Sequence, residues 1–128
     1  MCCVMGYTGH DLSAEKFKEY LLRTVDRGPD DQRVAESPYG LMGFGRLAFM
    51  GLTPEGMQPF YRGADCAVCN GELYGFRFEK EILKRRGYKF CSDCDCEILL
   101  PLYYEYGLDM FRHMDAEFAL IMYDSRKD

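Results

Sequence analysis

Apolar residues recur at helical spacing in three segments of the chain. A helix is predicted over 14–25, with Ser13 as its N-cap. The residues of its apolar face are Phe17, Tyr20, Leu21 and Val25. A second helix is predicted over 76–86 and ends at a glycine. The third is predicted over 95–106, where Pro101 implies a kink or a displaced start.

Strands are predicted where apolar and polar residues alternate, or where short apolar runs are bounded by turn residues. The predicted strands are 2–7, 32–36, 41–50, 65–69, 72–75, 88–91 and 116–124. Asn70-Gly71 is a typical hairpin turn, so 65–69 and 72–75 are expected to pair as a hairpin. Helices between strand pairs favour an α+β fold with mainly antiparallel sheet.

Composition narrows the classes of function. The chain has 128 residues, which fits one domain. Its net charge is −5 and it has no basic patch, so nucleic acid is not expected as a partner. No apolar run approaches the ~20 residues that span a bilayer, so no membrane partner is expected. Seven cysteines without an export signal indicate reduced thiols and a cytoplasmic location.

Cys2 is the first candidate for chemistry, because it directly follows the initiator. Removal of Met1 would leave one residue with both a thiol and a free α-amine. An α-amine has a pKa of about 7.7–8.0, so it can act as a base near neutral pH. A nucleophile beside its own base is a known means of activation. The alternative is a cysteine at position 2 without a role.

A cysteine that attacks glutamine needs donors for an oxyanion, a cation for the carboxylate and an acid for the ammonium. Asn70-Gly71 offers a side-chain amide beside a backbone N–H, although it is also a simple turn signal. Arg46 can bind a carboxylate bidentately, or can lie in water at a strand edge. Asp95 can hold an ammonium or cap a helix, and Glu72 can also hold an ammonium.

Seven segments resemble the class II glutamine amidotransferase domain of asparagine synthetases, an N-terminal-nucleophile hydrolase, in order and at similar spacing. The segments are Met1-Cys2, Arg27-Gly28-Pro29-Asp30, Phe44-Gly45-Arg46-Leu47, Gly56-Met57-Gln58-Pro59, Asn70-Gly71-Glu72-Leu73-Tyr74, Asp95-Cys96-Glu97-Ile98-Leu99, and Phe118-Ala119-Leu120 leading to Tyr123-Asp124. The resemblance covers the whole chain.

The resemblance implies a four-layer αββα sandwich of two antiparallel sheets. It implies that Cys2 is the nucleophile and that Asn70 and the Gly71 N–H form an oxyanion hole. The residues that it implies for the substrate L-glutamine are Arg46, Phe49 and Met50 at the carboxylate, and Glu72 and Asp95 at the ammonium. Ammonia would pass to a synthetase domain that makes asparagine from aspartate. ATP and Mg belong to that domain, and no cofactor or metal is expected for glutamine hydrolysis.

Among the departures of the chain from the family, two bear on the site and on the extent of the domain. Cys3 stands where glycine is usual after the nucleophile, and its side chain either crowds the site or points into the core. The chain, residues 1–128, also stops before the family's domain ends and lacks the synthetase domain, so an incomplete, C-terminally truncated domain is expected. An unpaired sheet edge would favour low activity or association into a homodimer.

Two other functions compete with this one. Cys66-x-x-Cys69 and Cys91-x-x-Cys94 resemble a structural zinc site. Residues three apart on a strand face opposite sides, however, so Cys66 and Cys69 are not expected to chelate one ion. The other alternative is a catalytically inactive interaction domain of the same fold.

Overall fold

A computed structural model describes residues 2–49 and 52–127. Its strands are β1 (Cys3–Thr8), β2 (Asp31–Ser37), β3 (Gly40–Arg46), β4 (Phe60–Arg62), β5 (Asp65–Tyr74) and β6 (Asp115–Tyr123). Its α-helices are α1 (Ala14–Leu22), α2 (Phe76–Arg85) and α3 (Leu99–Tyr106). Short 3₁₀ helices are η1 (Pro54–Gly56), η2 (Asp95–Ile98) and η3 (Gly107–His113). No helix in the described part of the chain is long and apolar enough to cross a membrane.

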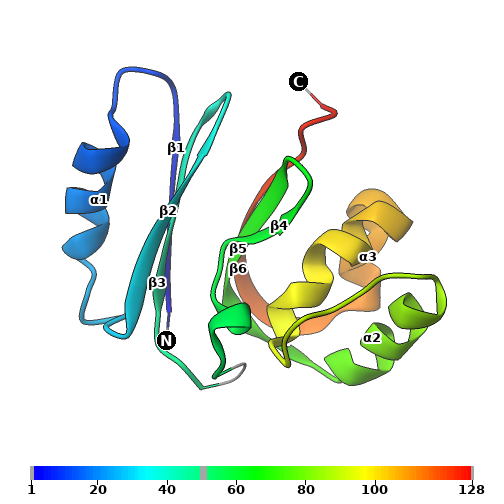
Figure 1. The fold of residues 1–128 in the computed structure, drawn as a ribbon. Helices are drawn as coiled ribbons and strands as arrows, with labels where there is room; N and C mark the ends of the chain where they lie inside the picture. The colour runs from blue at the N-terminus through cyan, green and yellow to red at the C-terminus, as the bar shows by residue number, and fades with distance from the viewer. Residues whose placement is uncertain (1, 50–51, 128) are drawn as a thin grey trace.

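Two three-stranded antiparallel sheets form the centre of the fold. Their strand orders are β1-β3-β2 and β4-β5-β6. Figure 1 shows the two sheets facing each other, with α1 outside the first sheet and α2 and α3 outside the second. The predicted α+β class and the αββα layering are therefore confirmed.

Side chains on β3 alternate between its two faces, so this one strand contacts both the other sheet and α1. Met42 and Phe44 are buried against the other sheet, whereas Gly43 faces α1. A Cβ atom at Gly43 would lie 2.9 Å from the Phe17 ring and 3.1 Å from Leu21. The absence of a side chain at this position therefore lets α1 pack closely on the sheet.

The predicted hairpin at Asn70-Gly71 is wrong, because β5 runs unbroken from Asp65 to Tyr74. Gly71 pairs with Phe118 of β6 in the middle of the strand. A Cβ atom at Gly71 would lie 2.4 Å from the Glu117 carbonyl oxygen. The glycine thus allows a close approach of two backbones and does not serve a turn.

The predicted strand over 88–91 is also wrong. Side chains bind its backbone groups: the Lys89 carbonyl accepts a hydrogen bond from Arg62, and the Cys91 N–H donates to Glu97. The backbone groups are satisfied without a sheet partner, so this segment is a loop.

Two helix boundaries differ from the pattern. The first helix ends at Leu22 instead of Val25, and Tyr20 and Val25 are 36% and 38% exposed, so only Phe17 and Leu21 of the predicted face are fully buried. The Ser13 N-cap is confirmed by the hydrogen bond that its hydroxyl accepts from the Lys16 N–H. The third helix begins at Leu99, which places Pro101 in its first turn and confirms the displaced start.

Candidate functional site

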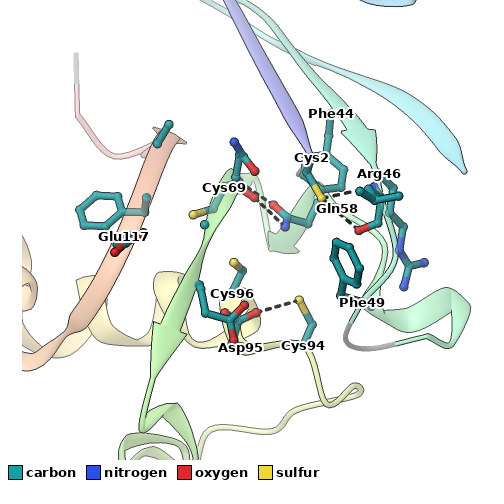
Figure 2. A pocket seen from close by; sticks show the side chains of 17 residues that line it. Cys2, Phe44, Arg46, Phe49, Gln58, Cys69, Cys94, Asp95, Cys96 and Glu117 are labelled. Atoms are coloured by element: carbon teal, nitrogen blue, oxygen red, sulfur yellow. Dashed lines mark hydrogen bonds between the residues drawn. The ribbon is translucent and has the colours of Figure 1, made fainter. Parts of the chain in front are cut away.

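A cavity of about 460 Å³ brings together residues from both sheets and from the loop before α3 (Figure 2). Its volume lies within the roughly 300–1,000 Å³ that is typical of small-molecule sites. The lining residues are Cys2, Phe44, Arg46, Leu47, Phe49, Gly56, Gln58, Cys69, Asn70, Gly71, Glu72, Cys94, Asp95, Cys96, Glu117, Phe118 and Ala119. Every predicted site residue lines this cavity except Met50, which lies outside the described residues.

Backbone groups of Leu47 fix the sulfur of Cys2. The Leu47 N–H donates to Cys2 Sγ at 3.3 Å, and the thiol donates to the Leu47 carbonyl at 3.4 Å. Cys3 is buried, does not line the cavity, and packs its Cβ beside Gly45. The pleat of the strand therefore directs Cys3 into the core, and it does not crowd Cys2.

The loop that contains Arg27-Gly28-Pro29-Asp30 holds the segment on either side of Leu47. The Asp30 N–H donates to the Arg46 carbonyl at 2.9 Å, and the Asp30 carboxylate accepts from the Ala48 N–H at 2.7 Å. A Cβ atom at Gly28 would lie 2.2 Å from the Gly45 carbonyl carbon, so the loop can approach this closely only with glycine. The loop thus positions the residues opposite Cys2.

Arg46 lies at the end of β3 and lines the cavity with Phe49. Its guanidinium donates to the Thr53 carbonyl at 3.4 Å. Phe49 is 75% exposed. These side chains place a cation and an aromatic surface beside Cys2, within reach of one small ligand.

Gln58 holds β5 immediately before Asn70. Its side-chain oxygen accepts from the Cys69 N–H at 2.6 Å, and its side-chain nitrogen donates to the Cys69 carbonyl at 3.0 Å. The side chain is buried, so both polar atoms are satisfied only through this pairing. Gln58 lies in one of the seven segments, but its residue type did not indicate this role. The contact of Leu47 with Cys2 was not expected either.

Asp95 lines the cavity from a buried position, and each of its carboxylate oxygens has a neighbouring group. One oxygen accepts from the Leu73 N–H at 2.7 Å, and the other lies 3.6 Å from the Cys94 sulfur. Cys94 occupies the N-cap position of η2, so Asp95 is not the cap of that helix. Glu72 lines the cavity from an exposed position on β5.

Three buried thiols adjoin Asp95. Those of Cys69 and Cys94 hydrogen-bond the Cys96 thiol and, together with burial, raise the pKa of Cys96. Cys66 lies on the other side of β5, 3.9 Å from the Met42 sulfur between the sheets. Cys66 and Cys69 therefore face opposite sides of the strand, as expected from their spacing, and do not form a shared zinc site.

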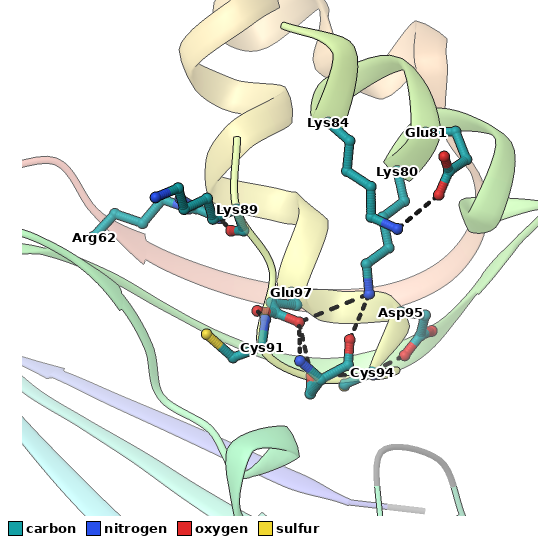
Figure 3. Close-up of polar contacts among 10 residues, drawn as sticks. Arg62, Lys80, Glu81, Lys84, Lys89, Cys91, Cys94, Asp95 and Glu97 are labelled. Atoms are coloured by element: carbon teal, nitrogen blue, oxygen red, sulfur yellow. Dashed lines mark hydrogen bonds and ion pairs between the residues drawn. The ribbon is translucent and has the colours of Figure 1, made fainter. Parts of the chain in front are cut away.

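A buried carboxylate orders the loop that leads to these thiols (Figure 3). Glu97 accepts hydrogen bonds from the Cys91 N–H at 2.6 Å and from the Ser92 N–H and hydroxyl at 2.9 and 2.8 Å. The Lys80 ammonium lies 3.9 Å from Glu97, and both side chains are less than 10% exposed. Lys80 also donates to the Ser92 carbonyl.

The variant Glu97→Ala is expected to lower the free energy of unfolding by about 3–5 kcal/mol, because it leaves Lys80 as an uncompensated buried charge. Urea denaturation followed by circular dichroism measures this change. Glu81→Ala is the matched control, since Glu81 forms an exposed ion pair with Lys84 and should unfold as the parent does. Equal urea midpoints for the two variants would contradict the prediction.

Comparison with known proteins identifies the family to which the chain is similar. The model of the family described as "Glutamine amidotransferase domain" matches residues 1–128. A probable asparagine synthetase (glutamine-hydrolyzing) of Acanthamoeba polyphaga mimivirus is 34% identical over 95% of this chain and 23% of its own length. The amidase chry2 of Gibberella zeae is 39% identical over 99% of this chain and 21% of its own length. Asparagine synthetase (glutamine-hydrolyzing) 3 of Bacillus subtilis is 31% identical over the whole chain and 22% of its own length. The chain thus spans less than a quarter of each of these relatives.

Proposed function

Because this chain belongs to the class II glutamine amidotransferase family, we propose that it hydrolyses the side-chain amide of L-glutamine to glutamate and ammonia. The observation that carries the proposal is the arrangement around one cavity of a cysteine at position 2, an Asn-Gly pair, an arginine and a buried aspartate. Each of these groups matches one chemical requirement of the reaction.

Cys2 is the proposed nucleophile once Met1 has been removed. Its α-amine takes the thiol proton as sulfur attacks the amide carbon, and the oxyanion forms near the Asn70 side-chain amide and the Gly71 N–H. Collapse breaks the C–N bond, and the amine returns the proton to the leaving ammonia. Water then hydrolyses the thioester, which releases glutamate and restores the thiol. No step needs a cofactor or a metal.

The other side chains hold the amino-acid end of glutamine. Arg46 binds the α-carboxylate through its planar guanidinium, with the backbone help from Phe49 or Met50 that the family resemblance implies. Asp95 and Glu72 bind the α-ammonium. The Leu73 N–H supports this assignment for Asp95, since it fixes one carboxylate oxygen and so orients the other.

We further propose that the ammonia is transferred to aspartate by a synthetase domain. The mimiviral and Bacillus relatives, which are far longer than this chain, are named as asparagine synthetases, and this supports aspartate as the acceptor. ATP and Mg would act in that domain. A reducing, cytoplasmic location is the proposed setting, because all seven cysteines are unpaired thiols.

An electrophilic glutamine analogue tests the nucleophile directly. We expect one adduct on Cys2 in protein whose N-terminal mass shows that Met1 has been removed, measured by intact mass spectrometry and peptide mapping. Excess L-glutamine should protect against labelling.

Two variants serve as controls for this labelling. Cys2→Ala should lose the adduct, whereas Cys91→Ala should keep it, because Cys91 is exposed and lies outside the cavity. Processed protein that remains unlabelled at Cys2, or that is labelled equally with and without glutamine, would count against glutamine hydrolysis.

Arg46→Lys is expected to raise KM for glutamine roughly tenfold with little change in kcat, because lysine keeps the charge but loses a bidentate hydrogen bond. Steady-state kinetics of ammonia release measures both constants. Arg112→Lys, in an exposed ion pair with Asp109, is the matched control and should leave KM unchanged. A fall in kcat with unchanged KM would show that Arg46 does not hold the substrate's carboxylate.

A further inference from the structure

Cys94, Asp95 and Cys96 place three metal-ligating atoms in one corner of the cavity. Two sulfurs and one carboxylate oxygen lie within 4.8 Å of one another, and all three residues are buried. Glutamine hydrolysis assigns a role to Asp95 alone. The two thiols beside it, on the same cavity wall, are left unexplained.

One distance within this set matches an edge of a tetrahedral zinc site. With Zn–S near 2.3 Å and Zn–O near 2.0 Å, a sulfur and an oxygen ligand lie about 3.5 Å apart, and two sulfurs about 3.8 Å apart. The Cys94 sulfur lies 3.6 Å from the Asp95 oxygen. This pair of ligand atoms therefore already lies at the separation that one shared ion requires, and the Cys96 sulfur lies within 4.8 Å of both residues' ligand atoms.

Neighbouring groups already orient this set. The Leu73 N–H binds the second oxygen of Asp95 and so turns the first toward Cys94. The Cys69 thiol is hydrogen-bonded to the Cys96 sulfur from β5. Such outer contacts orient the ligands of metal sites and strengthen binding. Cys94 is the N-cap residue of η2 and Asp95 and Cys96 lie in its first turn, so the backbone of this short helix fixes the spacing of the three residues.

We propose that Cys94, Asp95 and Cys96 bind a thiophilic divalent cation of the zinc class at the wall of the cavity. Three protein ligands leave a fourth position for water from the cavity. This ion differs from the structural zinc that the CxxC pairs resemble, because Cys66, Cys69 and Cys91 are not ligands. The ion binds the Asp95 carboxylate, which is assigned to the substrate's ammonium, and it therefore competes with glutamine. This consequence rests on the proposed function.

Cd²⁺ titration of the Cys2→Ala protein tests the site without a contribution from the nucleophile's thiol. Under argon and without a thiol reductant, we expect one equivalent of Cd²⁺ to bind, with the charge-transfer absorption of two thiolates. Cys94→Ser and Cys96→Ser should each lose half of this absorption and bind at least about 10–100-fold more weakly, the loss that removal of even an outer contact causes. Cys91→Ser, in the same loop but exposed, should titrate as the Cys2→Ala parent does.

X-ray absorption of the Zn²⁺-loaded parent provides a readout that needs no further variant. We expect two sulfur ligands near 2.3 Å and oxygen ligands near 2.0 Å. Absence of Cd²⁺ uptake, an unchanged titration in Cys94→Ser and Cys96→Ser, or a zinc shell without sulfur would each overturn the proposal.

Competition separates this proposal from glutamine hydrolysis. L-glutamine should raise the apparent Kd for Cd²⁺ in the Cys2→Ala protein, which binds substrate but cannot turn it over. Sulfur-ligated Cd²⁺ whose Kd does not respond to saturating glutamine would overturn the competition. Loss of Cys2 labelling would instead count against the hydrolytic function, whatever the metal titration shows.

Discussion

Replacement of Cys2 by alanine is expected to lower kcat for glutamine hydrolysis by roughly 10⁶-fold, the scale of loss when a covalent nucleophile is removed. In the proposed mechanism the sulfur of Cys2 is the attacking atom, and no other thiol would have an α-amine as its base. Coupled detection of glutamate and ammonia measures the loss. Cys3→Ala is the matched control, because Cys3 is buried outside the cavity and its replacement should retain activity.

The state of the N-terminus tests the same assignment from another side. Protein made with a cleavable leader before Cys2 should be inactive until cleavage frees the α-amine, and should then gain full activity. Equal activity before and after cleavage would contradict the role of the amine as base.

Asn70→Ala is expected to lower kcat by roughly 10²–10³-fold while KM changes little, because the donor acts on charge that develops only in the transition state. Steady-state kinetics measures both constants, and thermal unfolding checks that β5 remains intact. Asn70→Asp, with almost the same shape, should be no more active, since it places a carboxylate where negative charge develops.

Glu72→Gln is the comparison variant for this prediction, because Glu72 lies two residues further along β5. Loss of its charge should raise KM and leave kcat near that of the parent. An Asn70→Ala protein that raises KM in the same way, with kcat preserved, would place Asn70 among the binding groups and not in an oxyanion hole.

The elements that follow from local pattern could be predicted, whereas those set by distant partners could not. The Ser13 cap and the buried Phe17 and Leu21 follow from helical spacing. The unbroken β5 does not, because Asn-Gly is locally a turn signal and only pairing of Gly71 with Phe118 overrides it. The loop at 88–91 looked like a strand because its partners, Arg62 and Glu97, are side chains from elsewhere.

The candidate site shows the same division. Cys2, Arg46 and Asp95 were identified because their side chains carry the expected chemistry and lie in recognisable segments. Leu47 and Gln58 were missed, because they act through contacts with a sulfur and with backbone groups. Residue type carries no signal for such contacts, which exist only once β3, β5 and the N-terminus have come together.

The position of Asn70-Gly71 inside a strand has a consequence for the covalent lifetime of the protein. In a mobile turn, the glycine nitrogen attacks the asparagine side-chain carbonyl, ammonia leaves, and the imide opens to aspartate or isoaspartate, so asparagine is a thermolabile residue. The attack requires the backbone between the two residues to rotate. Here Gly71 is fixed opposite Phe118 and against the Glu117 carbonyl. The sheet therefore protects the Asn70 amide from slow deamidation, which would convert it into a carboxylate.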